Sequence, residues 1–363
     1  MPPEGAATGV LSGTDSQTPS HDGFDAALVA WQRQHGRSQL PWQNTRDPYK
    51  VWLSEVMLQQ TQVSTVLGYF ARFLQRFPDV AALAAAHEDE VLGLWSGLGY
   101  YSRARNMHRC AQEVVSRFGG KFPATAAQLM TLPGIGRSTA AAVAAFCFGE
   151  RVAILDGNVK RVLTRVLGFD ADLSVAANER TLWRIATDLL PDAADKAAIA
   201  SYTQGVMDLG ATVCTSRKPA CEICPMHQRC VARREAAQQR YPVKTRKLRR
   251  TAESLWMALA RNPAGQVWLA KRPATGIWAG LYCPPCFTSR ETLDAALAQA
   301  GVHDATHEPV FVHVLTHKDL HIHPVRVGCA GSASLAPGGA WFDEGEWSAL
   351  GLPAPVRKLL SNA

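Results

Sequence analysis

The feature that most constrains the fold of this chain is a dense group of cysteines. Cys214, Cys221, Cys224 and Cys230 follow the spacing C-x6-C-x2-C-x5-C. Thiolates this close together are better placed to surround one metal centre than to form two disulfides, and all-cysteine sites suit zinc or an iron–sulfur cluster. Zinc ribbons usually contain two C-x2-C pairs, whereas this loop has one, which favours iron–sulfur. The alternative is a set of ordinary buried cysteines.

Length and charge narrow the classes of protein. The chain has 363 residues, a net charge of +7 and a pI near 9.0. It is therefore long enough for two or three domains, and its charge favours polyanionic partners, although many basic proteins bind no nucleic acid. An odd total of nine cysteines, with no evident signal peptide, indicates free thiols in the cytoplasm. No apolar run reaches transmembrane length, so we expect no membrane partner.

Changes in composition divide the chain into four segments. Residues 1–22 are small and polar, which predicts a disordered tail. Residues 23–235 show apolar positions at three- and four-residue steps, which predicts an all-α domain, and Leu209-Gly210 is interpreted as a helix end just before the cysteine loop. Residues 236–250 form a basic linker, either simply solvated or lying along a phosphate backbone.

Residues 251–363 show a different pattern, typical of an α+β domain. Short alternating segments predict strands, an Asn-Pro-Ala-Gly stretch predicts a turn between the first two, and one amphipathic segment predicts a helix. The predicted strands are 255–259, 267–270, 310–315 and 321–327, the turn is 262–265, and the helix spans about 290–300.

A glycine-rich turn between two helical stretches, at about 126–147, predicts a helix-hairpin-helix. Gly134 and Gly136 let the backbone turn sharply and approach a partner closely, while the next helix presents free N–H groups. Such a turn binds a phosphate without reading a base. A lone Gly-x-Gly is weak evidence, and the flanking helices in a basic protein strengthen it.

Two carboxylic acids stand in contrasting sequence contexts. Glu55 has Val51, Trp52 and Leu58 as helical neighbours, and a carboxyl in such surroundings tends to stay protonated and can act as a general acid. Asp156 precedes a helix start, where negative charge is favoured and where it could steady a nearby positive charge. The plainer alternatives are a solvent-facing glutamate and a simple helix cap.

Taken in order along the chain, these pieces resemble one family. Leu40-Pro41-Trp42, the Gln-Gln-Thr-Gln that follows Leu58, and Gly97-Leu98-Gly99-Tyr100-Tyr101 precede the hairpin, the Asp156 motif and the cysteine loop. Together they resemble the MutY-type adenine DNA glycosylases of the helix-hairpin-helix base-excision superfamily. The resemblance is dense over about 24–235 and looser over 251–345. It implies one [4Fe–4S] cluster in the loop 214–230 and a monomer acting in the nucleoid.

The resemblance also implies an activity. The family extrudes and removes adenine mispaired with 8-oxoguanine or guanine in double-stranded DNA. Glu55 matches its acid, and Asp156 matches the residue that stabilises the developing sugar cation, by charge or covalently. Ser138 stands where strand-nicking relatives have a lysine, which implies a monofunctional enzyme, and Lys160 could trap the product sugar. The remaining residues that match DNA contacts are Gln59, Gln60, Tyr100, Gly134 and Gly136, with ordinary packing as the alternative for the first three.

The second domain resembles the MutT-like (Nudix-fold) domain of the same family, which contacts 8-oxoguanine. The stretch from Gly276 to Tyr282 fits, but the glutamate-rich magnesium box is missing, so nucleotide hydrolysis is not expected. Thr316 and His317 occupy the recognition loop, where the family usually has Phe-Ser-His. They keep the hydroxyl and the histidine, while the aromatic residue is replaced by Leu315.

Other functions compete with this one. A glycosylase–lyase for oxidised pyrimidines is opposed by Ser138, by the Gln-Gln pair and by the second domain. A non-catalytic, DNA-binding or redox-sensing iron–sulfur protein is opposed by the presence of both Glu55 and Asp156.

Overall fold

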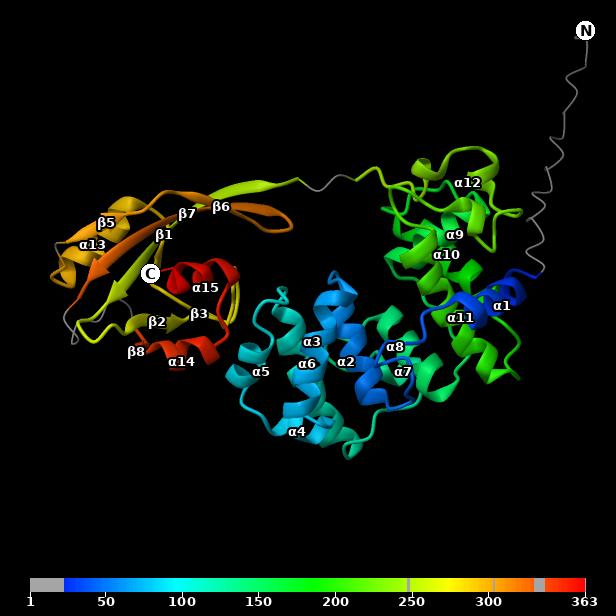
Figure 1. Ribbon diagram of the computed structural model, residues 1–363, viewed down its shortest axis with the longest axis horizontal. Coiled ribbons are helices and arrows are strands. Elements are labelled where there is room, and N and C mark those ends of the chain that lie inside the picture. The colour runs from blue at the N-terminus through cyan, green and yellow to red at the C-terminus, as the bar shows by residue number, and fades with distance from the viewer. Residues whose placement is uncertain (1–22, 247–248, 303, 330–336, 363) are drawn as a thin grey trace, which may run out of the picture.

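The computed structural model describes residues 23–246, 249–302, 304–329 and 337–362 (Figure 1). The predicted tail at residues 1–22 lies outside the described residues, as do residues 247 and 248 of the predicted basic linker. The described part consists of a helical region followed by a region built on one sheet, which is the all-α plus α+β arrangement predicted from the sequence. Within it, no helix is long and apolar enough to cross a membrane.

The helical region packs around two hydrophobic cores in the part of the chain that the structure describes. One core is formed by α2–α8, and the other by α1 with α9–α11 and the cysteine loop. The chain thus starts in the second core, crosses to the first, and returns. The helices are α1 (Phe24–His35), α2 (Pro48–Leu58), α3 (Val63–Arg76), α4 (Val80–Ala85), α5 (Glu88–Leu94), α6 (Ser102–Phe118), α7 (Ala126–Leu129), α8 (Arg137–Val143), α9 (Gly157–Leu167), α10 (Ala176–Asp188), α11 (Lys196–Asp208) and α12 (Val231–Arg234).

Local sequence chemistry fixes where the important helices begin. The Asp47 carboxylate accepts a hydrogen bond from the Tyr49 N–H (2.9 Å), and Pro48 occupies the first helical position of α2. Proline is favoured there because its missing N–H would have no helical partner. Asp156 caps α9 in the same way, accepting from the Val159 N–H at 2.7 Å. The start at Asp156 agrees with the sequence prediction.

The predicted helix end at Leu209-Gly210 is wrong. α11 continues without a break into a π-helical turn, Leu209–Val213, that leads directly to Cys214. Gly210 is needed for close packing rather than for termination, because a Cβ there would lie 2.7 Å from the Cβ of Asn158 on α9. Glycine therefore marks a helix–helix contact at this position.

The second region is one sheet over the described residues, with strand order β3-β2-β1-β7-β5, in which β4 also pairs with β1, β6 with β7, and β8 with β2. The long central strands β1 and β7 run parallel from Thr251↔Lys318 to Arg261↔Gly328. α13 covers one face of the sheet, and α14 and α15 cover the other. The elements are β1 (Thr251–Arg261), β2 (Val267–Lys271), β3 (Tyr282–Cys283), β4 (Cys286–Phe287), α13 (Arg290–Gln299), β5 (Ala305–His307), β6 (Phe311–Val314), β7 (Lys318–Gly328), β8 (Gly339–Phe342), α14 (Glu344–Ala349) and α15 (Ala354–Ser361).

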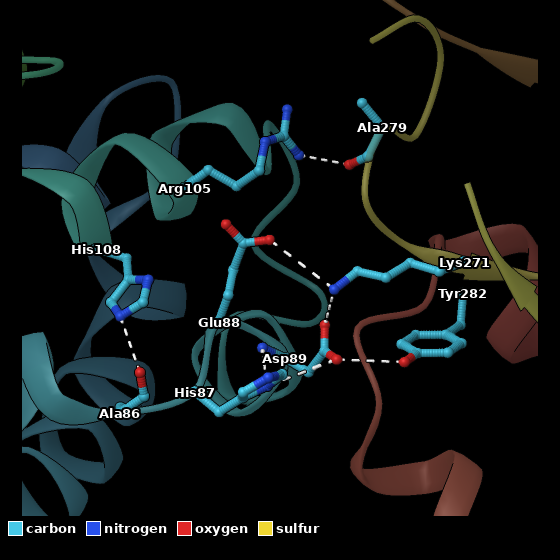
Figure 2. Close-up of polar contacts among 9 residues, drawn as sticks. All are labelled: Ala86, His87, Glu88, Asp89, Arg105, His108, Lys271, Ala279 and Tyr282. Atoms are coloured by element: carbon cyan, nitrogen blue, oxygen red, sulfur yellow. Dashed lines mark hydrogen bonds and ion pairs between the residues drawn. The ribbon is translucent and has the colours of Figure 1, made fainter. Parts of the chain in front are cut away.

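A polar contact joins the two regions beside α5 (Figure 2). The Lys271 ammonium lies 2.5 Å from Asp89 Oδ1 and 4.0 Å from Glu88 Oε1. The Tyr282 hydroxyl donates to Asp89 Oδ2 at 3.2 Å. Asp89 therefore receives partners from two neighbouring strands of the sheet region, at the first turn of a helix, where negative charge is favoured.

A second set of contacts continues this interface. The Tyr101 hydroxyl donates to the Leu352 carbonyl at 2.7 Å, and the Arg357 guanidinium donates to Ser96 Oγ at 3.1 Å. Leu281 is completely buried in the core of the helical region, although it belongs to the sheet region. The interface thus combines apolar burial with hydrogen bonds, which favours one fixed orientation of the two regions.

Reversing the charge of Lys271 tests this interface. In Lys271→Glu the new carboxylate faces Asp89 and Glu88, so we expect docking to weaken by about 1 kcal/mol or more. Small-angle scattering would then show a larger radius of gyration, and proteases would cut the 236–250 segment faster. Adding Asp89→Lys should restore both readouts, and Lys358→Glu, an exposed position on α15, is the matched control. Equal behaviour of Lys271→Glu and the control would contradict the interface.

Candidate functional site

A cavity of about 1000 Å³ lies between the two halves of the helical region. Glu55 enters it from α2, which belongs to the first core, and Asp156 enters it from the start of α9, which belongs to the second. Ser138 and Thr139 of α8 line the same cavity. The two carboxylic acids, 101 positions apart in the printed numbering, therefore meet in one space large enough to hold an extruded nucleotide.

Glu55 has an unusual charge state. Its neighbours Trp52 and Leu53 are fully buried in the core. Burial, reinforced by the nearby negative charge of Asp156, raises the pKa of Glu55 to about 7. Water that would solvate the carboxylate is excluded, so the neutral acid is favoured. Glu55 therefore holds a proton near neutral pH and can donate it.

Asp156 is held by hydrogen bonds at the start of α9. Its Oδ1 accepts from the Val159 N–H (2.7 Å) and its Oδ2 accepts weakly from the Asn158 amide (3.5 Å). The partial positive charge at the start of α9 adds to these contacts. The site thus contains one carboxyl in an apolar setting and one at a helix N-terminus, which is the contrast predicted from the sequence.

The two glutamines and the tyrosine differ in their relation to the cavity. Gln59 ends α2 and lines the cavity, and its amide donates to Thr139 Oγ1 at 3.4 Å. Gln60 and Tyr100 are exposed and do not line it. Both have left-handed backbone conformations, with φ of 58° and 46°. Such values are unfavourable for residues other than glycine, so the surrounding structure must hold them.

The glycine turn lies where the sequence predicted it. Gly134 has φ +75°, and a Cβ there would lie 2.6 Å from the Cβ of Asn106 on α6, so only glycine fits. Gly136 is the exposed N-cap of α8, and Ser138 follows in its first turn. The turn connects α7 to α8, in agreement with the predicted helix-hairpin-helix.

Lys160 is not directed into the cavity. Its ammonium forms an ion pair with Glu179 of α10, with 2.6 Å between Nζ and Oε1, and it is not among the residues that line the cavity.

Thr316 and His317 occupy the tip between β6 and β7. Both are exposed, and the Tyr100 hydroxyl lies 3.1 Å from Thr316 Oγ1. The backbone holds the tip in place, since the Arg250 guanidinium donates to the Thr316 carbonyl (3.0 Å) and the Thr251 N–H to the His317 carbonyl (3.1 Å). The structure thereby brings together candidate DNA contacts from both regions.

The four cysteines of the loop line one small cavity together with apolar side chains of α9. Arg165 Nη1 lies 3.5 Å from Cys214 Sγ, and its guanidinium also donates to the carbonyls of Thr215 (2.7 Å) and Ser216 (2.9 Å). In the part of the chain that the structure describes, no group of three or more His, Cys, Asp or Glu has the geometry of a single-ion site. All nine cysteines of the chain are free. The donor set and the enclosing cavity fit an iron–sulfur group.

Comparison with known proteins identifies the families that the two regions resemble. Residues 53–187 match the HhH-GPD superfamily of base excision DNA repair proteins, and residues 256–362 match the NUDIX domain. The adenine DNA glycosylase of Buchnera aphidicola subsp. Acyrthosiphon pisum (strain APS) is 36% identical over 344 residues, which cover 93% of this chain and 97% of that protein. The adenine DNA glycosylase of Homo sapiens is 32% identical over 403 residues, covering 93% and 73% respectively.

The chain belongs to the adenine DNA glycosylase family. A solved thermostable thymine-DNA glycosylase is also similar, with 27% identity and a TM-score of 0.51, over 58% of this chain and 95% of that one. The predicted family, the helix-hairpin-helix domain and the Nudix-fold domain are confirmed.

The comparison also decides between zinc and iron–sulfur. Residues 214–230 match the iron-sulfur binding domain of endonuclease III, and this match spans all four cysteines. The loop is therefore an iron–sulfur binding segment of this adenine DNA glycosylase family member. Zinc and incidental buried cysteines are excluded as interpretations.

Sequence reasoning missed several polar residues of the cavity. Arg37, Asn44, Arg46 and Gln204 line it but were not singled out. Arg37 pairs with the fully buried carboxylate of Asp208 on α11, at 2.6 Å. The polar residues just before the cap of α2 could have been recognised as candidate cavity residues from the sequence. No local sequence pattern, however, predicts that Arg37 has its partner on α11.

The raised pKa of Glu55 makes stability depend on pH. Because the folded chain binds this proton more tightly than the unfolded chain, the contribution is fully present below about pH 4.5 and is lost as the pH rises through about 7. We expect Glu55→Gln to be more stable than the natural chain at pH 8, by up to about 3 kcal/mol, and close to it near pH 5. Urea unfolding followed by tryptophan fluorescence measures this difference. Glu344→Gln, at an exposed position, is the control, and a difference independent of pH would contradict the assignment.

Proposed function

We propose that this protein removes adenine mispaired with 8-oxoguanine or guanine in double-stranded DNA, by hydrolysing the N-glycosidic bond. The observation that carries the proposal is the meeting in one cavity of Glu55, whose pKa is raised to about 7, and Asp156, which caps α9. Family membership supports adenine as the base. The alignment with the Buchnera relative covers 93% of this chain and 97% of that protein, so it includes both regions.

The chemistry follows from the two acids. Adenine leaves poorly as an anion, so Glu55 donates its proton to a nitrogen of the purine. The C1′–N9 bond then breaks, its electron pair stays with the base, and positive charge develops on the sugar. The Asp156 carboxylate stabilises that charge, by proximity or by a transient covalent bond to C1′. Water adds to C1′ and its proton is released, so the products are free adenine and an abasic sugar.

Access to adenine requires base extrusion. We assign Gln59, Gln60 and Tyr100 as the residues that enter the duplex, because Gln59 lines the cavity and the other two are exposed and have unfavourable backbone conformations. Gly134 and Gly136 would let backbone N–H groups bind a phosphate next to the extruded nucleotide.

The enzyme is proposed to be monofunctional. Ser138 lines the cavity and offers no amine. Lys160 is the nearest lysine to Asp156 in the sequence, but its ammonium is paired with Glu179. A Schiff base needs an amine that reaches C1′ of the sugar, and Lys160 does not line the cavity.

The base opposite adenine is proposed to be read by the β6–β7 tip. Thr316 offers a hydroxyl and His317 an imidazole from an exposed position that already contacts Tyr100. The docked interface at Asp89 (Figure 2) joins the region that carries this tip to the helical region, and Thr316 lies beside Tyr100. Discrimination of 8-oxoguanine from guanine would therefore depend on both regions.

The cofactor is proposed to be one [4Fe–4S] cluster held by Cys214, Cys221, Cys224 and Cys230. Bound there, the cluster would fix the shape of the loop rather than take part in base removal. The exposed side chains of Arg217 and Lys218 would then face DNA phosphates. The protein would act as a monomer.

Duplexes with a single adenine opposite 8-oxoguanine or guanine test the function. We expect the natural protein to release adenine and to leave a strand that breaks only after alkali treatment. Glu55→Gln and Asp156→Asn should each lower excision by about 10²-fold or more, since each removes an acid–base or electrostatic contribution, while mispair binding is kept. Rates are measured under single-turnover conditions, and binding by fluorescence anisotropy.

Other outcomes of this assay identify the competing functions. Direct strand nicking would indicate a glycosylase–lyase, and tight binding without base loss by the natural protein would indicate a non-catalytic DNA-binding protein. Excision by either variant at the natural rate would remove that residue from the catalytic pair.

Substitution of one cluster ligand tests the cofactor. In Cys224→Ser we expect loss of the visible iron–sulfur absorption, less iron per chain than the four atoms of a [4Fe–4S] cluster, and a lower melting temperature, because metal binding and folding of such loops are coupled. Cys329→Ser changes a buried cysteine outside the loop and should retain full iron content. Iron and acid-labile sulfide are measured chemically on purified protein.

A further inference from the structure

One guanidinium connects the end of α2, which lines the cavity, with the segment just before α6. Arg103 of α6 is 9% exposed. Its Nη1 donates to the carbonyls of Val56 (2.9 Å), Met57 (3.0 Å) and Gln59 (2.6 Å). These carbonyls end α2, where the last turn of a helix has no helical donors. A cation placed there also complements the negative end of the helix dipole.

The other nitrogen of the same group holds two further segments. Nη2 donates to Thr61 Oγ1 (3.2 Å) and to the carbonyls of Leu98 (3.1 Å) and Gly99 (3.3 Å). The guanidinium carbon lies 5.5 Å from the centre of the Tyr100 ring. Arg103 thus contacts the Gln59 carbonyl and the Thr61 hydroxyl on either side of Gln60, and the two carbonyls just before Tyr100.

Both of these residues have unfavourable backbone conformations. Gln60 and Tyr100 lie in the left-handed region, and neither is glycine. Conformations of this kind persist only where the surroundings over-determine them. Arg103 supplies such a constraint for both, because its two nitrogens are joined in one rigid plane.

We propose that Arg103 is a positioning residue that holds the Gln59–Thr61 and Leu98–Tyr100 segments as one rigid unit and fixes the end of the helix that carries Glu55. The proposal rests on the proposed function. The Gln60 and Tyr100 side chains would enter the duplex together, because their backbones share one anchor. Glu55, one turn before Gln59, would keep its place as adenine is extruded.

The group acts through geometry and not through titration. Burial lowers the pKa of Arg103 to about 10, an effect opposed by Tyr100, so it stays charged at neutral pH. A lysine would keep the charge but has a single nitrogen, which cannot span carbonyls on both segments. Arg103→Lys therefore keeps the positive charge but removes the hydrogen bonds that join the two segments.

The experiment measures base extrusion as well as excision. In Arg103→Lys we expect single-turnover excision from an adenine–8-oxoguanine duplex to fall about 10²-fold, as for a small misplacement of reacting groups. The pH at which the residual rate is half-maximal should stay unchanged, because Glu55 remains the acid. With Glu55→Gln also present and 2-aminopurine as the target base, the fluorescence rise on binding should be lost at saturating protein.

Controls separate this role from simple stability. Arg117→Lys, an exposed position at the end of the same helix, should match the natural protein in excision, and Arg117→Lys with Glu55→Gln should match Glu55→Gln alone in extrusion. Thr61→Val removes one acceptor and should show a smaller decrease in the same direction if Arg103→Lys does not fold.

A full fluorescence rise for the Arg103→Lys double variant, or unchanged excision by folded Arg103→Lys or Thr61→Val, would overturn the proposal. Lack of excision by the natural protein would instead overturn the proposed function.

Discussion

The rest of the site depends on the placement of the Glu55 carboxyl. It lies in apolar surroundings on α2, in the same cavity as the carboxyl of Asp156. Burial of α2 among aromatic side chains removes the water that would stabilise a charged Glu55, and Asp156 adds repulsion. Asp156 itself accepts a hydrogen bond from the Val159 N–H of α9. One fold therefore places a proton donor and a second carboxyl group within the same cavity.

The path of the chain makes this meeting possible. Over the described residues, the chain begins in the core of α1 and α9–α11, builds the core of α2–α8, and returns at α9 to the core in which it began. A cavity lies where the two cores meet, so each contributes one acid. The iron–sulfur loop closes the returning half, because the π turn Leu209–Val213 extends α11 directly to Cys214.

The second region extends the site beyond the cavity. Its docking on α5 and α6 through Asp89 and Tyr101 sets the β6–β7 tip beside Tyr100 (Figures 1 and 2). Residues proposed to read the opposite base and residues proposed to enter the duplex are thus in contact before any DNA is bound. Arg103 joins two segments within the helical region, since its guanidinium donates to carbonyls of both the Gln59–Thr61 and the Leu98–Tyr100 segments.

Local chemistry was enough to predict the helix start at Asp156, the glycine turn at Gly134, and β1, β2, β6, β7 and α13 of the second region, because each depends on neighbours in sequence. It failed at Gly210, where glycine serves contact with Asn158 rather than a helix end. The sequence by itself therefore determined these elements, the cysteine spacing of the loop and the contrasting contexts of the two acids. The tertiary structure alone decided that α2 faces α9, that Lys160 pairs with Glu179, and that the two regions dock, because packing between distant segments leaves no periodic signal in either one.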